Sequence, residues 1–149
     1  MIRAGQNSLL KHSKTPEAEP YKTFYEEKIK SNGGVLAIFA GEVPEDAKLG
    51  FFKVSTQHWN NLSTFILKEL PSYLPESGFI NGEIPGEDDF HVGVWLARIT
   101  LVCGGTPTKD GYKALEKELK EPVPAKVAAY WEAWFERPGW KQVYSESLR

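Results

Sequence analysis

Residues 85–105 read PGEDDFHVGVWLARITLVCGG. Apolar side chains fall on every side of a helix drawn through residues 87–103, which is typical of a helix enclosed by protein. The segment is shorter than the roughly 20 residues that span a bilayer. It also contains charged side chains, such as Asp88 and Arg98, which are costly to place inside a bilayer, so a membrane-spanning helix is not expected. Gly104-Gly105 supplies a helix stop. The sequence therefore predicts a buried central helix over about residues 87–103.

The entry to this helix carries a capping pattern. Asp89 stands three residues after Gly86, so its carboxylate can accept a hydrogen bond from the Gly86 N–H and also meets the positive end of the helix dipole. Gly93, inside the helix, costs roughly 1 kcal/mol relative to alanine. We therefore expect another helix backbone to pass close to Gly93.

Spacings of three and four residues indicate further helices on both sides of the central one. Gly33-Gly34 is followed by an apolar run, and periodicity leaves open whether this run continues the preceding helix or forms a separate element. We find no strand-length alternation of apolar and polar residues. The sequence predicts an all-α bundle of about five or six helices, with residues 1–20 as a lead-in or linker and residues 21–149 as a single helical domain. The other predicted helices are 21–31, 51–70, 110–119 and 124–137, followed by a last turn at 140–144.

The amino-acid composition indicates which kinds of binding partner and which cellular compartment to expect. The 18 basic and 20 acidic residues give a net charge of −2, which makes nucleic acid and anionic membranes poor partners. A single cysteine excludes an intrachain disulfide and suits a reducing compartment. The polar N-terminus lacks the apolar core of a signal peptide. We expect a cytoplasmic protein.

Two stretches resemble one known family. Residues 79–90, FINGEIPGEDDF, resemble the "F-x-x-G, then S/T-x-A-D" capping box at the start of the buried sixth helix in glutathione transferases. Residues 123–131, VPAKVAAYW, and 137–144, RPGWKQVY, resemble the "P-x-x-V-x-x-Y/W … R-P-x-W" ending of many chains of that family. Together they cover about residues 50–145. The chain departs at Gly86, where the family usually has Ser or Thr; glycine offers no side-chain acceptor, so Asp89 should carry more of the capping.

The resemblance implies the all-helical, C-terminal domain of a glutathione transferase. The complete protein would conjugate glutathione to apolar electrophiles, a detoxification reaction, and could form a homodimer. The family binds glutathione, the co-substrate, on an N-terminal thioredoxin-like domain that also supplies the catalytic Tyr, Ser or Cys. Residues 1–50 show no βαβ pattern. We therefore expect no cofactor, no catalytic residue and no tight glutathione binding in this chain, whose missing partner would be that domain.

The resemblance also implies contacts with the hydrophobic substrate. The substrate-binding residues would be Tyr21, Phe24, Tyr25, Lys28, His91 and Trp95. The same aromatic side chains equally suit a packed core, and a buried histidine is usually satisfied by hydrogen bonds. Gly86 and Asp89 have a structural capping role and not a catalytic one.

Other sites find little support. His12, His58 and His91 show no metal-ligand spacing, and one cysteine cannot complete a Cys-based zinc site, so we predict no metal. Cys103, in an apolar helix, is expected to be a buried, inert thiol. The alternatives to a transferase fragment are a non-catalytic protein-interaction module and a small-ligand carrier of the same fold.

Overall fold

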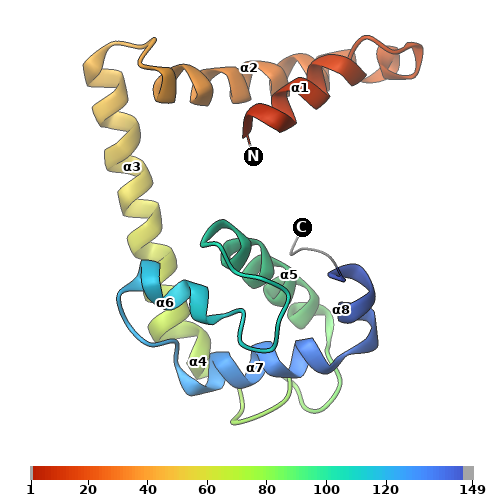
Figure 1. Cartoon of the computed structure of the whole chain (residues 1–149), viewed down its shortest axis with the longest axis vertical. Coiled ribbons are helices and arrows are strands. Elements are labelled where there is room, and N and C mark those ends of the chain that lie inside the picture. Colours follow the sequence, from red (N-terminus) through yellow and green to blue (C-terminus); the bar gives the residue numbers. More distant parts are fainter. Residues whose placement is uncertain (1, 146–149) are drawn as a thin grey trace. The chain divides into compact units, whose positions relative to one another are not determined.

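The computed structural model describes residues 2–145 of the chain and contains helices, turns and loops but no strand within that range. An isolated bridge between Phe79 and Gly82 is the β-type pairing found there. The all-α prediction is therefore confirmed for these residues. Figure 1 labels the α-helices. In chain order the elements are α1 (Ile2–His12), the 3-10 helix η1 (Pro16–Tyr21), α2 (Lys22–Ala40), α3 (Glu45–Thr64), the π-helical turn η2 (Phe65–Glu69), α4 (Leu70–Tyr73), α5 (Glu87–Val102), α6 (Lys113–Leu119), α7 (Ala125–Glu136) and α8 (Pro138–Val143).

The chain divides into two compact units, Met1–Gln57 and His58–Arg149, and the boundary falls inside α3. This division differs from the predicted lead-in over residues 1–20 and single domain over residues 21–149. Most of the expected lead-in is helical: α1 packs along α2, and Gln6 Nε2 donates a hydrogen bond of 3.1 Å to the carbonyl oxygen of Ile29. Sequence reasoning missed α1 because its residues are mostly polar.

The first unit has little enclosed core. Ala18 is the one hydrophobic residue of its described part that is fully buried. Helix α2 runs without interruption through Gly33-Gly34, which resolves the alternative left open by periodicity. Phe39 of α2 meets Phe51 and Phe52 of α3 edge-to-face, with ring centroids 6.1 and 5.8 Å apart. These aromatic contacts join the end of α2 to the beginning of α3, which starts at Glu45 rather than at the predicted residue 51.

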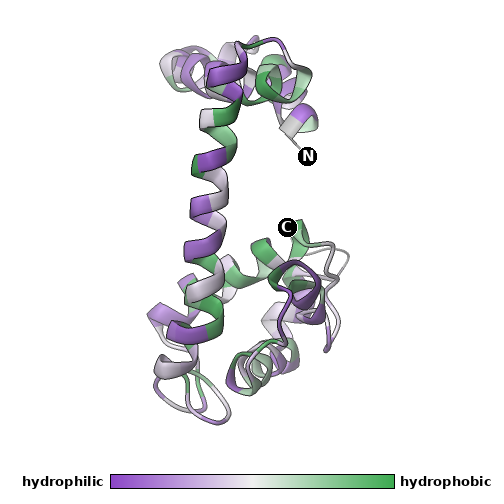
Figure 2. Ribbon diagram, turned by 90° about the vertical axis from the view of Figure 1, so that its left-hand side faces the viewer, coloured by the Kyte–Doolittle hydropathy of each residue, from purple (hydrophilic) through white to green (hydrophobic). Residues whose placement is uncertain are grey.

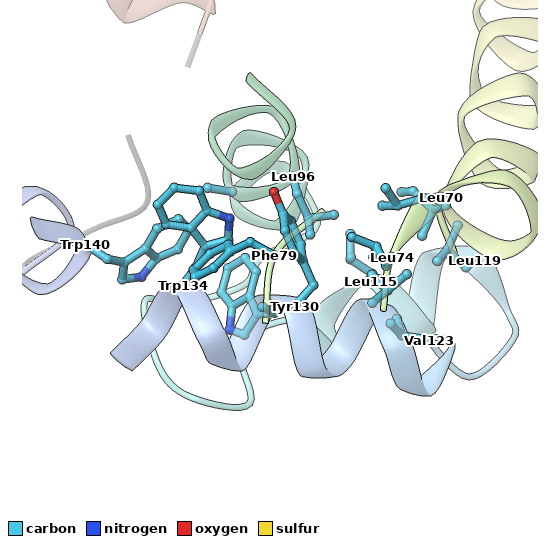
Figure 3. Close-up of a cluster of buried hydrophobic side chains, with 14 of the residues drawn as sticks. Leu70, Leu74, Phe79, Leu96, Leu115, Leu119, Val123, Tyr130, Trp134 and Trp140 are labelled. Carbon is cyan, nitrogen blue, oxygen red and sulfur yellow. The ribbon is translucent and has the colours of Figure 1, made fainter. Parts of the chain in front are cut away.

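The second unit contains the hydrophobic core. Figure 3 shows Tyr130 and Trp134 extending from α7 toward α5, while leucines from α4 and α6 fill the other end. Edge-to-face contacts link Phe79 to Tyr130 at 5.9 Å and to Trp134 at 5.0 Å. Such pairs add roughly 0.5–1.5 kcal/mol each beyond area burial. The buried set comprises Ile66, Leu70, Leu74, Phe79, Leu96, Ala97, Leu115, Leu119, Val123, Val127, Tyr130, Trp131, Trp134, Trp140 and Tyr144.

Helix α3 continues into the core through a π-helical turn. Figure 2 shows apolar residues near both ends of α3 and mostly polar ones between them. In η2 the Leu70 N–H donates to the carbonyl oxygen of Phe65, a spacing of five residues. Pro71 follows within the first turn of α4. Proline has no N–H and clashes with the carbonyl four residues earlier in a regular helix, so the wider π turn lets the chain stay helical to Tyr73, past the predicted end at residue 70.

Helix α5 is buried along one stripe rather than all round. The buried side is formed by Asp89, Gly93, Leu96, Ala97 and Thr100. Outside this stripe, Phe90 is 56% exposed and Val102 is 73% exposed. The prediction of a fully enclosed central helix is therefore wrong for the second unit taken by itself, because the elements that pack on α5 cover a single face.

Gly93 of α5 lies directly against the indole ring of Trp134 in α7. A Cβ atom placed on Gly93 would lie 2.5 Å from Nε1 and 2.6 Å from Cε2 of Trp134. The prediction of a close neighbour is confirmed, but the neighbour is an indole ring and not a helix backbone. The absence of a side chain at Gly93 makes room for Trp134, one of the two tryptophans of α7.

We predict that Gly93→Ala destabilises the second unit by up to about 2 kcal/mol, because an overpacking cost of roughly 1–3 kcal/mol outweighs the roughly 1 kcal/mol that alanine gains in helix propensity. Denaturant unfolding followed by tryptophan fluorescence and circular dichroism measures the change. The matched control is Gly50→Ala in α3, where a Cβ meets nothing within 4 Å, and we expect this variant to gain stability. A Gly93→Ala protein at least as stable as the wild type would contradict the packing described.

Candidate functional site

The entry to α5 is organised by one carboxylate. Asp89 is fully buried. Its Oδ2 accepts a 2.8 Å hydrogen bond from the Gly86 N–H, and its Oδ1 accepts a 3.0 Å hydrogen bond from the Ile80 N–H. The first of these is the predicted cap, and the second ties the preceding loop to the helix. Asp89 thus satisfies two backbone donors by itself, since Gly86 has no side chain to contribute.

Tyr130 connects α7 to the same point. Its hydroxyl donates a 3.1 Å hydrogen bond to the backbone carbonyl oxygen of Asp89. Burial raises the pKa of Tyr130 far above its usual range, and the negative charge of Asp89 raises that pKa further, while the neighbouring Trp134 acts to lower it. The hydroxyl therefore stays protonated and serves as a hydrogen-bond donor. This cluster is structural and offers no free acid, base or nucleophile.

Four of the predicted substrate contacts lie in the first unit. Tyr21 ends η1, and Phe24, Tyr25 and Lys28 follow on α2. Phe24 meets Tyr25 edge-to-face at 5.6 Å, and Lys28 Nζ lies 5.8 Å from the Phe24 ring centroid. Tyr21 is 64% exposed and Phe24 is 53% exposed. The structure brings Phe24, Tyr25 and Lys28 together on the surface of α2.

The other two predicted contacts lie in the second unit and share a hollow. His91 and Trp95 of α5 line it together with Val92 and with Phe65 of η2, and its volume is about 410 Å³. Phe65 and Trp95 pack edge-to-face with centroids 5.4 Å apart. His91 is exposed. The hollow is shallow and almost entirely apolar, so it can hold an uncharged hydrophobic group with the imidazole at its edge.

Sequence reasoning missed a larger cavity between α5 and α8. It has a volume of about 500 Å³ and is lined by Pro85, Phe90, Val94, Trp134, Arg137, Pro138, Gly139, Trp140, Val143 and Tyr144. The spacing of Phe90 and Val94 by four residues was a signal for an apolar face beside the core stripe. It was read as part of an all-round buried helix, so the second face went unnoticed.

Two further side chains near these elements have shifted pKa values. Burial raises the pKa of the Cys103 thiol, and the negative charge of Glu118 raises it further. Burial also raises the pKa of Tyr144, although the positive charge of Arg98 opposes this shift. Cys103 is half-buried rather than fully buried as predicted, since it caps the end of α5. A thiol whose neutral form is favoured is a poor nucleophile.

No cluster of three or more His, Cys, Asp or Glu side chains that could hold a metal ion occurs in the described part of the chain. His12, His58 and His91 are exposed on separate helices. Within residues 2–145 we also find no helix with the length and apolar character needed to cross a membrane.

Comparisons with known proteins add nothing to the geometry. No protein-family model matches the chain, and none of the curated proteins or solved structures compared with it matches either. The site is therefore interpreted from its own residues.

We predict that Asp89→Ala lowers the free energy of unfolding by about 2–6 kcal/mol, because two backbone N–H groups lose their acceptor at roughly 1–3 kcal/mol each. The matched control is Asp88→Ala, whose side chain is exposed on the same turn and should cost less than about 1 kcal/mol through the helix dipole. Denaturant unfolding of the three proteins provides the comparison.

Gly86→Ser tests the same cap in the opposite direction. A Cβ at Gly86 would lie 3.7 Å from Asp89 Oδ2, which is ordinary contact, so serine can enter and add the acceptor that glycine lacks. We expect a gain of a few tenths of a kcal/mol. Equal losses for Asp89→Ala and Asp88→Ala would show that Asp89 is not the residue that caps α5.

We predict that Cys103 reacts with iodoacetamide more slowly than an unstructured cysteine at pH 8 to 9, because its raised pKa lowers the thiolate fraction. Because the folded chain favours the neutral thiol of Cys103, this thiol contributes to stability at pH values below its ordinary pKa of 9.0. The contribution is lost as the pH rises through the higher pKa that Cys103 has in the folded chain. Alkylation rates against pH, for the folded chain and the chain in denaturant, measure the shift. Glu118→Gln should lower the pKa, and identical folded and unfolded profiles would disprove the shift.

Proposed function

We propose that this chain is the helical domain of a glutathione transferase homologue and supplies the wall of a hydrophobic-substrate site. The observation that carries the proposal is the cap at the entry to α5. The family-like stretch that begins at Phe79 leads to Asp89, whose buried carboxylate accepts from the Gly86 and Ile80 N–H groups. A carboxylate in this place is what the resembled capping box requires, and the all-α content of the described residues agrees with a helical domain.

The C-terminal stretch that resembles the family also has a structural role here. Tyr130 and Trp131 are buried on α7, and Pro138 opens α8. Trp140 then packs edge-to-face on Trp131 at 5.4 Å and lies tilted against Trp134 at 5.7 Å. The "R-P-x-W" segment thus turns the chain so that an aromatic ring closes the end of the core. This role explains why such a segment follows α7.

The chemical role assigned to the chain is binding rather than catalysis. The hollow formed by Phe65, His91 and Trp95 offers apolar surface for an electrophile. Conjugation also needs a stabilised glutathione thiolate held against that electrophile. In the proposal a thioredoxin-like domain provides the thiolate, and residues 2–145 contain no strand from which such a domain could be built. The chain by itself should therefore bind the electrophile and not turn it over.

One observation favours a second candidate, a non-catalytic interaction module. Helix α5 carries three exposed apolar residues, Phe90, Val94 and Val102, which are 56%, 44% and 73% exposed. Apolar residues gathered on one element are typical of a contact surface for another protein. A stable homodimer or hetero-complex that covers α5, without electrophile binding, would favour this function.

We predict that the pure chain shows no heat of binding with glutathione up to millimolar concentration and no conjugation of chlorodinitrobenzene. Equilibrium dialysis should detect saturable binding of the same electrophile, because the hollow provides its apolar surface. Trp95→Ala should weaken this binding, and Val102→Ala, an exposed position on the same helix, should leave it unchanged. Glutathione binding, or the absence of electrophile binding, would contradict the proposal.

A further inference from the structure

A third hollow, a groove, lies between α3 and the end of α6. Figure 1 shows α6 beside the part of α3 that belongs to the second unit. One wall of the groove is the strip of α3 and η2 from Trp59 to Lys68, and the other is the turn from Glu118 to Glu121. Its volume of about 390 Å³ lies within the range of roughly 300–1,000 Å³ typical of small-molecule sites. It shares no lining residue with the hollow at His91 or with the cavity between α5 and α8.

The groove carries charged groups of both signs that are not paired with one another. Lys68 and Lys120 supply two ammonium groups, and Glu118 and Glu121 supply two carboxylates. None of these side chains takes part in the ion pairs found among residues 2–145. An ammonium group can only donate hydrogen bonds, and an ionised carboxylate can only accept them. A charged ligand would be repelled by one of the two pairs, whereas a neutral ligand with hydroxyl groups can bond to both.

The aromatic side chain of the groove suits a ligand that also has C–H surface. Trp59 lines the groove and is half-buried. The face of an indole ring carries partial negative charge and therefore attracts the partly positive hydrogens of C–H groups. Leu67 and Leu119 add apolar surface to the same groove. A sugar ring combines C–H groups on its faces with hydroxyl groups around its edge, and each hydroxyl both donates and accepts.

The backbone at Lys120 gives a further reason to assign a role to its side chain. Lys120 caps α6 with a φ of 59° and a ψ of 20°, the left-handed conformation, and is the one residue other than glycine with a positive φ in the described part of the chain. Helices that end in this conformation usually have glycine there, because a side chain is strained. Strained residues of this kind cluster at functional sites. The strain therefore favours a binding role for the Lys120 ammonium group.

We propose that the groove between α3 and α6 binds a short neutral carbohydrate, with one sugar ring on the face of Trp59. The hydroxyl groups of the sugar donate to Glu118 and Glu121. They accept from the ammonium groups of Lys68 and Lys120. The strip from Trp59 to Lys68 is about 13 Å long at the rise of a helix, so the groove has room for more than one ring. This function goes beyond the one proposed above and uses neither the hollow at His91 nor any glutathione chemistry.

Titration of the full chain with neutral disaccharides tests the proposal by nuclear magnetic resonance. The probes are maltose, cellobiose and diacetylchitobiose, and the reporter is the indole N–H signal of Trp59, assigned by its loss in Trp59→Phe. We expect a saturable shift of this signal with at least one probe at millimolar concentration. Chitobiose, which lacks the acetyl groups and is cationic at slightly acidic pH, should bind more weakly than diacetylchitobiose. Cellobiouronate, which is anionic, should likewise bind more weakly than cellobiose.

Methyl glycosides of the same sugars distinguish two sources of the ligand. A methyl glycoside imitates a sugar that is joined to a larger glycan, whereas the unmodified disaccharide imitates a free one. Equal binding of the two forms would support a site for the end of a glycan, and loss of binding on methylation would support a site for a free sugar.

Lys120→Gly separates binding from folding. Glycine adopts the left-handed conformation without strain, so this variant should unfold at the same or a higher denaturant concentration than the wild type. Its affinity for the disaccharide should nevertheless fall about fivefold, because a hydrogen bond from a charged donor is lost. Lys120→Gln should weaken binding to a similar extent. Lys117→Gln, exposed on the same helix and outside the groove lining, is the matched control and should leave the affinity unchanged.

Three results would overturn the proposal. The first is the absence of a saturable shift of the Trp59 signal with all three neutral disaccharides. The second is tighter binding of chitobiose or cellobiouronate than of their neutral counterparts. The third is an equal effect of Lys120→Gln and Lys117→Gln on the affinity, which would show that the Lys120 ammonium group does not contact the sugar.

Discussion

The packing of the second unit depends on the hydrogen bonds that the buried carboxylate of Asp89 accepts. This carboxylate accepts hydrogen bonds from the Gly86 and Ile80 N–H groups, so it fixes both the start of α5 and the loop before it. Tyr130 then bonds the backbone of the same residue and sets the position of α7. With α5 and α7 held at this point, Trp134 is brought against Gly93, and the aromatic cluster that includes Phe79 closes around it.

Features that depend on residues close together in the sequence could be predicted, and features that depend on packing between distant segments could not. The cap was predictable because it depends on residues only three apart, and the spacing of Gly86 and Asp89 is visible in the printed sequence. The central helix and α7 followed from periodicity and from flanking Pro and Gly residues. Helix α1 was missed because its stability comes from packing along α2, with the hydrogen bond from Gln6 to the Ile29 carbonyl as one contact. Its mostly polar sequence gives no pattern from which packing against another helix could be predicted.

The candidate sites were harder to predict for a related reason. An apolar residue in a helical pattern indicates a position that can be buried, but it does not show whether another element covers that position or which one does. Val94 and Leu96 look alike in the sequence, yet Val94 is 44% exposed and Leu96 is buried. The cavity at Arg137 combines residues more than 40 positions apart, from Phe90 to Tyr144. Only the path of the chain through α7 brings them together, and no local spacing encodes that path.

The π-helical turn at Phe65–Glu69 has a consequence for the length of this segment. A π turn holds one residue more than the regular helical turn it replaces, so it is equivalent to a single-residue insertion preserved within a helix. Removing that residue would rotate Trp59 and Leu62, which pack against the core, by about 100° relative to Leu70 and Leu74. The length of this segment is therefore constrained by the core that lies on both sides of it, so that even a single-residue deletion here would disturb the packing of α3 on the second unit.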